Sequence, residues 1–270
     1  FPLNLTVSNG GLESWLKHRV IPKNRAYVDA LLSKTGLSAN RPLGIIAVCK
    51  GLSLNDCYWV DSADNESSFA KVNLYDNRFS TILASIAFTG YGSSVRSSLF
   101  SSPEFSTNGM LPKCWRRING KIYLYKGGTS GFSNTGFEPY SELYAYQIAK
   151  AMEINAIRYT LTKDLKKSLC SKCELFTSKD YSYMPIGQLV RKGNMEAIRE
   201  YYQTLGQSFV DALDDMIIFD ALICNVDRHL GNFGVLVNNV TNQIDKPAPL
   251  FDHGNSLFSL GGLDLWNNET

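Results

Sequence analysis

Cysteine is scarce in this 270-residue sequence: its six cysteines are too few for a fold built on disulfides. Cys49 in AVCK and Cys224 in ICN have apolar neighbours, which is typical of buried free thiols. The only close pair is Cys170 and Cys173 in CSKCELF. No second Cys or His pair lies nearby, so ordinary strand cysteines are favoured over a zinc site. We therefore expect a reduced, cytoplasmic protein.

Charge of one sign and long apolar runs are also lacking. The 27 basic and 25 acidic residues give a formal net charge of +2, so no direct nucleic-acid binding is expected. The longest apolar stretches, residues 43–48 and 82–88, fall short of the roughly 20 residues that cross a bilayer, so no membrane span is expected. No secretory signal is evident, and the chain begins FPLN without a methionine. A hydrophobic content of 44% can supply the core of one large domain or two modest ones.

Residues 1–100 predict a mixed, mainly helical accessory region. Helical spacing occurs in LESWLKHRV and in RAYVDALLSKTGL, where Gly36 suits a helix C-cap. NDCYWVDS predicts a short strand, and FSTILASIAFTG predicts a helix that ends at Gly90. A stretch rich in Ser and Gly follows and marks a boundary.

Residues 101–178 predict an antiparallel sheet with one helix. KCWRRI and KIYLYKGG flank Asn119 and Gly120, which tolerate the positive φ angles of a tight hairpin turn. EPYSELYAYQIAKAMEI predicts a helix that begins near Pro139 and has an apolar face formed by Leu143, Tyr146, Ile148 and Met152. AIRYTLTK and CELFTS predict two further strands.

Residues 179–270 predict a helical region. Two helical patterns, NMEAIREYYQTL and SFVDALDDMIIFDALI, lead into the polar segment NVDRHLGN, and the strands FGVLVNN and APLFD follow. The expected fold class is therefore α+β. It has two lobes of the protein-kinase type, an antiparallel-sheet N-lobe over residues 101–178 and a helical C-lobe over residues 179–270.

The polar segment has the spacing of a phosphotransfer site. Such a site needs a carboxylate to receive the hydroxyl proton, oxygen ligands for a divalent metal and a cation for the nucleotide phosphates. Asp227 precedes Asn232 by five residues, and Asp252 follows in LFDHGNSL, as in the general kinase pattern. We expect Asp227 to be the catalytic base and Asn232 and Asp252 to be metal ligands. Gly254 allows the chain to turn away sharply behind Asp252.

The expected cation is Lys126, at the end of the strand KIYLYK. In kinases a helix glutamate holds this lysine. Glu142 is the expected partner and Glu138 is the second candidate. A glutamate in the first turn of a helix is also common for another reason, because it complements the helix dipole.

NVDRHLGNFGVL together with PLFDHGNSL resembles the HipA-like kinase family, and the DRH form also resembles the catalytic loop of phosphatidylinositol kinases. NGMLPKCW, NGKIYLYKGG and EPYSELYAYQIA are similar to the phosphate-loop, lysine-strand and helix segments of HipA-like proteins. The resemblance covers roughly residues 106–260. It implies ATP and Mg²⁺ as cofactors, with Asp227, Lys126, Asn232 and Asp252 as the catalytic set.

The same resemblance implies phosphorylation of Ser or Thr in a protein substrate. It also implies a bacterial toxin–antitoxin or related system with an antitoxin-like or regulatory partner. Self-phosphorylation in the phosphate loop is implied as well, where Ser106 and Thr107 are the matching hydroxyls. The expected nucleotide contacts are Lys126, Glu142, Gly109, Glu174 and Phe176.

The sequence departs from ordinary kinases in two ways. Arg228 and His229 follow the aspartate, whereas His-Arg precedes it in those enzymes, so their roles do not transfer; His229 is expected to shape the loop. Only 18 residues follow Asp252, so we expect either a fragment or a lobe completed by residues 1–100. Two alternatives to an active protein kinase stay open. They are a nucleotide-binding pseudokinase that engages a partner and a lipid kinase, the latter suggested only by the DRH form.

Overall fold

The structure is a computed structural model that describes residues 2–5, 11–61, 67–93, 101–129, 136–163, 168–190 and 193–257. In chain order its elements are α1 (Gly11–Lys17), α2 (Val28–Thr35), α3 (Pro42–Cys49), α4 (Phe69–Val72), α5 (Thr81–Thr89), η1 (Pro103–Phe105), β1 (Lys113–Ile118), β2 (Lys121–Gly127), α6 (Glu138–Ala151), β3 (Tyr159–Lys163), β4 (Leu169–Glu174), β5 (Tyr181–Pro185), η2 (Ile186–Gln188), α7 (Met195–Leu205), α8 (Gln207–Leu222), β6 (Gly234–Asn238) and β7 (Gln243–Pro247). The α+β class with antiparallel sheets is confirmed. Each described helix is too short or too polar to cross a membrane.

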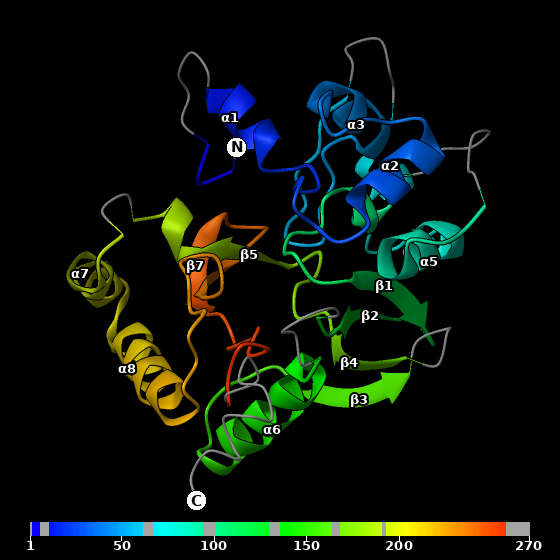
Figure 1. Ribbon diagram of the computed structural model, residues 1–270. Coiled ribbons are helices and arrows are strands. Elements are labelled where there is room, and N and C mark those ends of the chain that lie inside the picture. Colours follow the sequence, from blue (N-terminus) through cyan, green and yellow to red (C-terminus); the bar gives the residue numbers. More distant parts are fainter. Residues whose placement is uncertain are drawn as a thin grey trace, which may run out of the picture. The chain divides into compact units, whose positions relative to one another are not determined.

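The first of two compact units comprises residues 1–125 and 177–179. Its helices α2, α3 and α5 share one apolar core that includes Leu31, Ile45 and Phe105 (Figure 1). Gly36 and Gly90 end α2 and α5 with φ angles of 74° each, a conformation that favours glycine. The mainly helical character predicted for this part of the chain is therefore confirmed.

The aromatic segment 55–61 is not a strand, contrary to the prediction from NDCYWVDS. Side chains hold it instead. Arg19 donates to both carboxylate oxygens of Asp56 at 2.7 Å and to the carbonyl oxygen of Tyr58 at 2.9 Å. The prediction was wrong because strand propensity depends on a neighbouring strand, and here a buried guanidinium takes that place.

The predicted hairpin of β1 and β2 is confirmed. Asn119 and Gly120 have φ angles of 49° and 80°, so both residues of the turn are left-handed, as a tight hairpin requires. Lys126 is the next-to-last residue of β2 and the first residue of the second unit. The predicted division at residues 100 and 178 stays a prediction.

The second unit comprises residues 126–176 and 180–270. In it β3 pairs antiparallel with β4, and α6 packs against both strands (Figure 1). The buried side of α6 carries Glu142, Ala145 and Ala149. The four residues of the predicted apolar face are half-buried, and Ile148 and Met152 pack against the core of this unit. A stripe of small residues lets α6 approach closely and brings a carboxylate into the interior.

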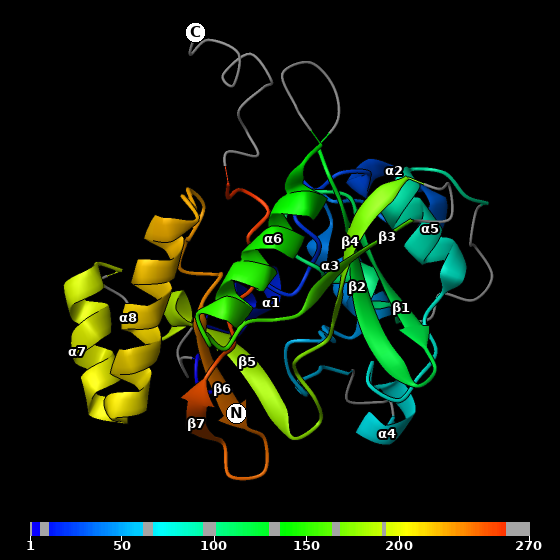
Figure 2. The same cartoon turned by 90° about the horizontal axis from the view of Figure 1, so that it is seen from below.

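A second sheet in this unit has the order β5-β6-β7, with both pairs antiparallel (Figure 2). Beside it α7 and α8 pack against one another through a core that includes Ile198, Phe209 and Leu213. The strand predicted from APLFD is misplaced, because the partner of β6 is Gln243–Pro247. The chain still returns to the start of β6, where the N–H of Ala248 donates to the carbonyl oxygen of Gly234 at 3.0 Å.

Candidate functional site

Lys126 is 4% exposed, and its ammonium lies between two carboxylates. Nζ donates to Oε1 of Glu142 and to Oδ1 of Asp252. Burial alone would lower the pKa of Lys126, but the charges of Asp252 and Glu142 outweigh burial and raise that pKa above its ordinary value. The lysine is therefore a fixed cation, and the predicted Lys126–Glu142 pair is confirmed.

Glu142 also connects α6 to the segment that carries Asp252. Its Oε2 accepts a hydrogen bond from the backbone N–H of His253 at 2.9 Å. Next to it, the hydroxyl of Ser141 bonds the carbonyl oxygens of His253 and Ser256, at 2.8 Å each. Glu138, the second candidate for the lysine, accepts from the backbone N–H of Thr129 at 3.0 Å instead. One side of α6 thus holds both the cation and the segment 252–256.

Asp252 adopts a left-handed backbone conformation with φ at 62°, which is uncommon for a residue other than glycine. The surroundings fix this conformation, because its N–H donates to the hydroxyl of Tyr159 at 3.3 Å while its carboxylate pairs with Lys126. Its side chain keeps 37% of its surface exposed. Strained backbone of this kind concentrates at binding sites, and the exposed carboxylate can reach a ligand.

Asp227 and Asn232 lie on the short loop between α8 and β6. Asn232 is buried, and its Nδ2 donates to the carbonyl oxygen of Asp227 at 3.3 Å. Asp227 itself is exposed. The loop is anchored to β5, where the hydroxyl of Tyr183 donates to the carbonyl oxygen of Gly231 at 2.8 Å. An accessible carboxylate and a fixed amide therefore share one rigid loop.

Arg228 joins this loop to the segment of Asp252. Nε and Nη2 donate to the two carboxylate oxygens of Asp220 at 2.8 and 3.0 Å. Nη1 donates to the carbonyl oxygens of Asn232 at 3.0 Å and Phe251 at 2.7 Å. The side chain is 8% exposed. Sequence reasoning left Arg228 without a role; in the structure it holds one proposed metal ligand and the residue that precedes the other.

His253 is fully buried beside this guanidinium. Nη2 of Arg228 donates to its Nδ1 at 3.0 Å, and its ring meets Phe219 edge-on with centroids 5.3 Å apart. Burial, and then the charge of Arg228, lower the pKa of His253 to about 3. The imidazole is therefore neutral. Since Nδ1 accepts a hydrogen bond, the proton is on Nε2.

His229 shapes the loop, as the sequence predicted. Its Nδ1 accepts the backbone N–H of Gly231 at 3.0 Å, which closes a tight turn in front of Asn232. The side chain is otherwise exposed. Arg228 and His229 are thus adjacent in sequence but differ in environment.

Glu174 and Phe176, which are expected nucleotide contacts along with Lys126 and Glu142, also lie in the second unit. Phe176 packs against Tyr183 and Phe251, with ring centroids 5.5 and 5.3 Å away. Phe251, one member of this aromatic cluster, directly precedes Asp252. Glu174 lies exposed at the end of β4. Their contact with a nucleotide stays a prediction.

The remaining predicted residues lie in the first unit. Gly109 has φ at 90°. The hydroxyl of Thr107 donates to the carbonyl oxygen of Pro103 at 2.6 Å and accepts from Nε1 of Trp115 at 2.9 Å. Ser106 is buried. Both hydroxyls are therefore engaged or covered in this conformation, and self-phosphorylation at either one would require the segment to open.

The donor set fits Mg²⁺. Among the described residues there is no group of three or more His, Cys, Asp or Glu side chains that could hold a metal unaided. Mg²⁺ does not need one, because it usually binds one or two carboxylates together with water and substrate phosphates. Asp252 offers an exposed carboxylate. The Nδ2 bond of Asn232 fixes its amide, so that Oδ1 is the atom left for a metal.

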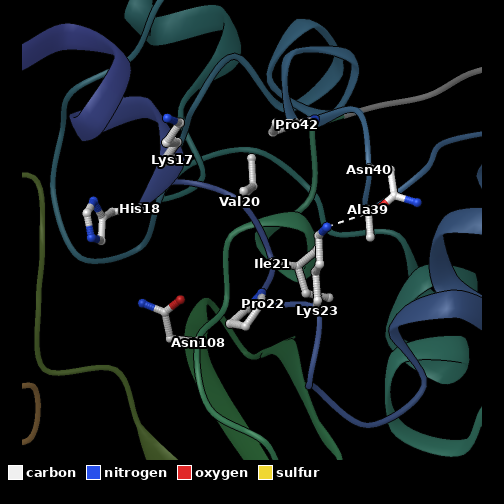
Figure 3. A pocket seen from close by; sticks show the side chains of 10 residues that line it. All are labelled: Lys17, His18, Val20, Ile21, Pro22, Lys23, Ala39, Asn40, Pro42 and Asn108. Atoms are coloured by element: carbon white, nitrogen blue, oxygen red, sulfur yellow. Dashed lines mark hydrogen bonds between the residues drawn. The ribbon is translucent and has the colours of Figure 1, made fainter. Parts of the chain in front are cut away.

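The first unit contains an open cavity of about 400 Å³ lined by Lys17, His18, Val20, Ile21, Pro22, Lys23, Ala39, Asn40, Pro42 and Asn108 (Figure 3). None of the predicted site residues lines it. Its basic side chains already have partners. Lys17 pairs with Glu13 at 2.9 Å, Nδ1 of His18 donates to the carbonyl oxygen of Ser14 at 2.7 Å, and Nζ of Lys23 donates to Asn40 at 2.9 Å. The basic side chains of this cavity are therefore already engaged within the chain.

Sequence reasoning missed several residues that hold the site, among them Asp220 and Asn255. The sequence does contain a signal for Asp220: a carboxylate in the largely apolar run IIFDALI, at the end of α8, indicates a specific partner. Asn255 follows Asp252 by three residues, and nothing in its spacing indicates that its Nδ2 donates to Oδ2 of Asp227 at 2.9 Å.

No family model and no curated protein matches the chain. Solved structures do match. The proinflammatory kinase CtkA of Helicobacter pylori aligns with 58% of this chain and 60% of its own, at 21% identity and a TM-score of 0.49. HipA of Shewanella oneidensis MR-1, solved with HipB and operator DNA of a toxin–antitoxin system, aligns with 89% of this chain and 63% of its own, at 16% identity and a TM-score of 0.49. This chain thus spans less than two thirds of either protein.

Proposed function

We propose that the protein transfers the γ-phosphoryl group of ATP, with Mg²⁺, to a Ser or Thr hydroxyl of a protein. The observation that carries this proposal is one connected network in the second unit. Lys126 bonds Glu142 and Asp252, and Arg228 ties the segment of Asp252 to the loop of Asp227 and Asn232. These are the cation, the oxygen ligands and the accessible carboxylate that phosphoryl transfer needs.

Each side chain has one task in this proposal. Asp227 accepts the proton of the acceptor Ser or Thr hydroxyl. The hydroxyl oxygen then bonds to the γ-phosphorus as the bond from the γ-phosphorus to the leaving ADP oxygen breaks. Lys126 binds phosphate oxygens, and Glu142 keeps it in place. Asn232 and Asp252 hold Mg²⁺, which neutralises charge on the phosphates when bound. Gly109, Glu174 and Phe176 as nucleotide contacts, an antitoxin-like partner and a cytoplasmic location belong to the same proposal.

Transfer of radiolabelled phosphate from ATP tests the proposal, with the protein itself and a bacterial lysate as acceptors. Asp227→Asn should lower the rate by about 10²–10⁴-fold, because the amide cannot take a proton, while nucleotide binding persists. Asp211→Asn is the matched control, an exposed acid on α8 in the same unit, and should leave the rate unchanged. Removal of Mg²⁺ with EDTA should stop transfer in the wild type and in Asp211→Asn.

Other outcomes select the alternatives. ATP binding without transfer to any protein would indicate a pseudokinase. Labelling of phosphoinositide in anionic vesicles, with none in protein, would indicate a lipid kinase. Either result would contradict the protein-kinase proposal.

A further inference from the structure

We infer that Asn255 is a positioning residue that holds the carboxylate of Asp227 for proton transfer, an inference that rests on the proposed function. Nδ2 of Asn255 donates to Oδ2 of Asp227 at 2.9 Å. Asp227 is exposed, and an untethered exposed carboxylate samples several rotamers. The hydrogen bond selects one of them.

Main-chain contacts place Asn255 at this point. The N–H of Val226 donates to the carbonyl oxygen of Asn255 at 3.3 Å, and the N–H of Leu257 donates to that of Ile223 at 2.7 Å. Residues 255–257 therefore run beside residues 223–226. Asn255 contacts the loop at two successive residues, with its main chain at Val226 and its side chain at Asp227.

Asp227 is also held from its other side. Its backbone N–H donates to Oδ1 of Asn225 at 3.1 Å, and Nδ2 of Asn225 donates to Oδ1 of Asp220 at 2.9 Å. The end of α8 thus fixes the main chain of Asp227. Asn255 adds a hydrogen bond to the carboxylate itself.

An amide suits this task chemically. It donates a hydrogen bond without carrying a charge, and it cannot compete with Asp227 for the hydroxyl proton. The bond engages Oδ2, so Oδ1 is the oxygen that would receive the proton. Because Asn255 is three residues after Asp252, the segment that presents a metal ligand also aims the base.

The test compares Asn255→Ala and Asn255→Asp with wild type and with Asn24→Ala, an exposed asparagine of the first unit. Asn255→Ala should lower kcat by about tenfold to a hundredfold, with the KM for ATP unchanged, because the base is misplaced while the nucleotide ligands stay. Asn24→Ala should match wild type. Equal kcat in Asn255→Ala and wild type would overturn the inference while leaving the proposed function intact.

Asn255→Asp supplies a readout that loss of packing cannot give. Aspartate has nearly the size of asparagine, but it cannot donate this hydrogen bond and its charge repels Asp227, so kcat should fall at least as far as in Asn255→Ala. A double-mutant cycle with Asp227→Asn completes the design. If Asn255 acts through Asp227, Asn255→Ala should have little further effect in that background. A wild-type kcat in Asn255→Asp, or the same fold-loss for Asn255→Ala in both backgrounds, would refute positioning. A wild type without transfer would refute the proposed function as well.

Discussion

His253 is a neutral imidazole enclosed between Phe219 and the guanidinium of Arg228. Its pKa is about 3 in the folded protein against an ordinary value of 6.5. Between these values the unfolded chain binds the extra proton, so the free energy of unfolding should fall as pH falls from 6.5 towards 3. The expected slope from this one group is about 1.4 kcal/mol per pH unit.

Denaturant unfolding of wild type and His253→Gln at several pH values checks this. Glutamine can still accept a hydrogen bond from Arg228 but does not titrate. The free energy of unfolding of His253→Gln should therefore depend less steeply on pH, by the slope that corresponds to about one proton. His18→Gln and His229→Gln replace exposed histidines and serve as controls. Identical slopes for His253→Gln and wild type would mean that His253 is not held neutral.

At the scale of single residues, sequence reasoning went as far as chemistry and spacing allow. Asp227, Asn232 and Asp252 followed from the order of a base and two oxygen ligands, and Lys126 from its place at a strand end. Asn255 could not be found this way. Its contact with Asp227 exists because two distant segments pair through main-chain hydrogen bonds, and main-chain pairing leaves no residue type to recognise.

Among the elements, β6 depends on a close approach at Gly234. This residue faces Pro185 of β5, and a Cβ placed on it would overlap the carbonyl oxygen of Met184. Gly234→Ala should therefore force β5 and β6 apart and lower the free energy of unfolding by about 1–3 kcal/mol. Guanidinium unfolding measures the change.

Gly44→Ala is the matched control for this glycine. It lies in α3, where the nearest atom to an added Cβ is Cβ of Arg41 at 3.9 Å. Alanine is the better helix residue, so this variant should gain about 0.5–1 kcal/mol. A Gly234→Ala protein as stable as wild type would show that β5 does not approach β6 so closely.

The helices and strands that were predicted correctly are those whose geometry is set by neighbouring residues in the sequence. The Asn-Gly hairpin and the glycine-capped helices carry their geometry in adjacent residues, and these were predicted correctly. β5 was missed, and β7 was sought in APLFD. The real strand, QIDKP, is polar and largely exposed, so the apolar signal lies beyond its end. Pairing with β6, a tertiary contact, decides where β7 runs.

For the molecule as a whole, the reactivity of the cysteines tests whether the interiors of both units are closed to solvent. None of the six, all within the described residues, forms a disulfide. Cys224 is exposed, contrary to the expectation from its apolar neighbours, and Cys57 is half-buried. Cys49 and Cys114 are buried in the first unit and Cys170 and Cys173 in the second. Burial raises the pKa of Cys49, and it raises the pKa of Cys173 to about 12. Both effects suppress the reactive thiolate.

An alkylating reagent in native buffer should therefore modify Cys224 first, and the four buried thiols should react only after denaturation. Peptide mass spectrometry identifies the modified positions. Cys224→Ser should remove the fast reaction. Labelling of Cys173 at the rate of Cys224 would show that the interior of the second unit is open.

The hydrogen bonds of Arg228 define the smallest part of this protein that could be transplanted. A designer who grafted residues 225–232 alone onto another scaffold would bring a guanidinium without its carboxylate and an aspartate without its amide donor. The graft would have to include the end of α8 with Asp220 and the segment 251–257 as well. Two stretches that are separate in sequence, residues 220–232 and 251–257, would therefore have to move as one piece.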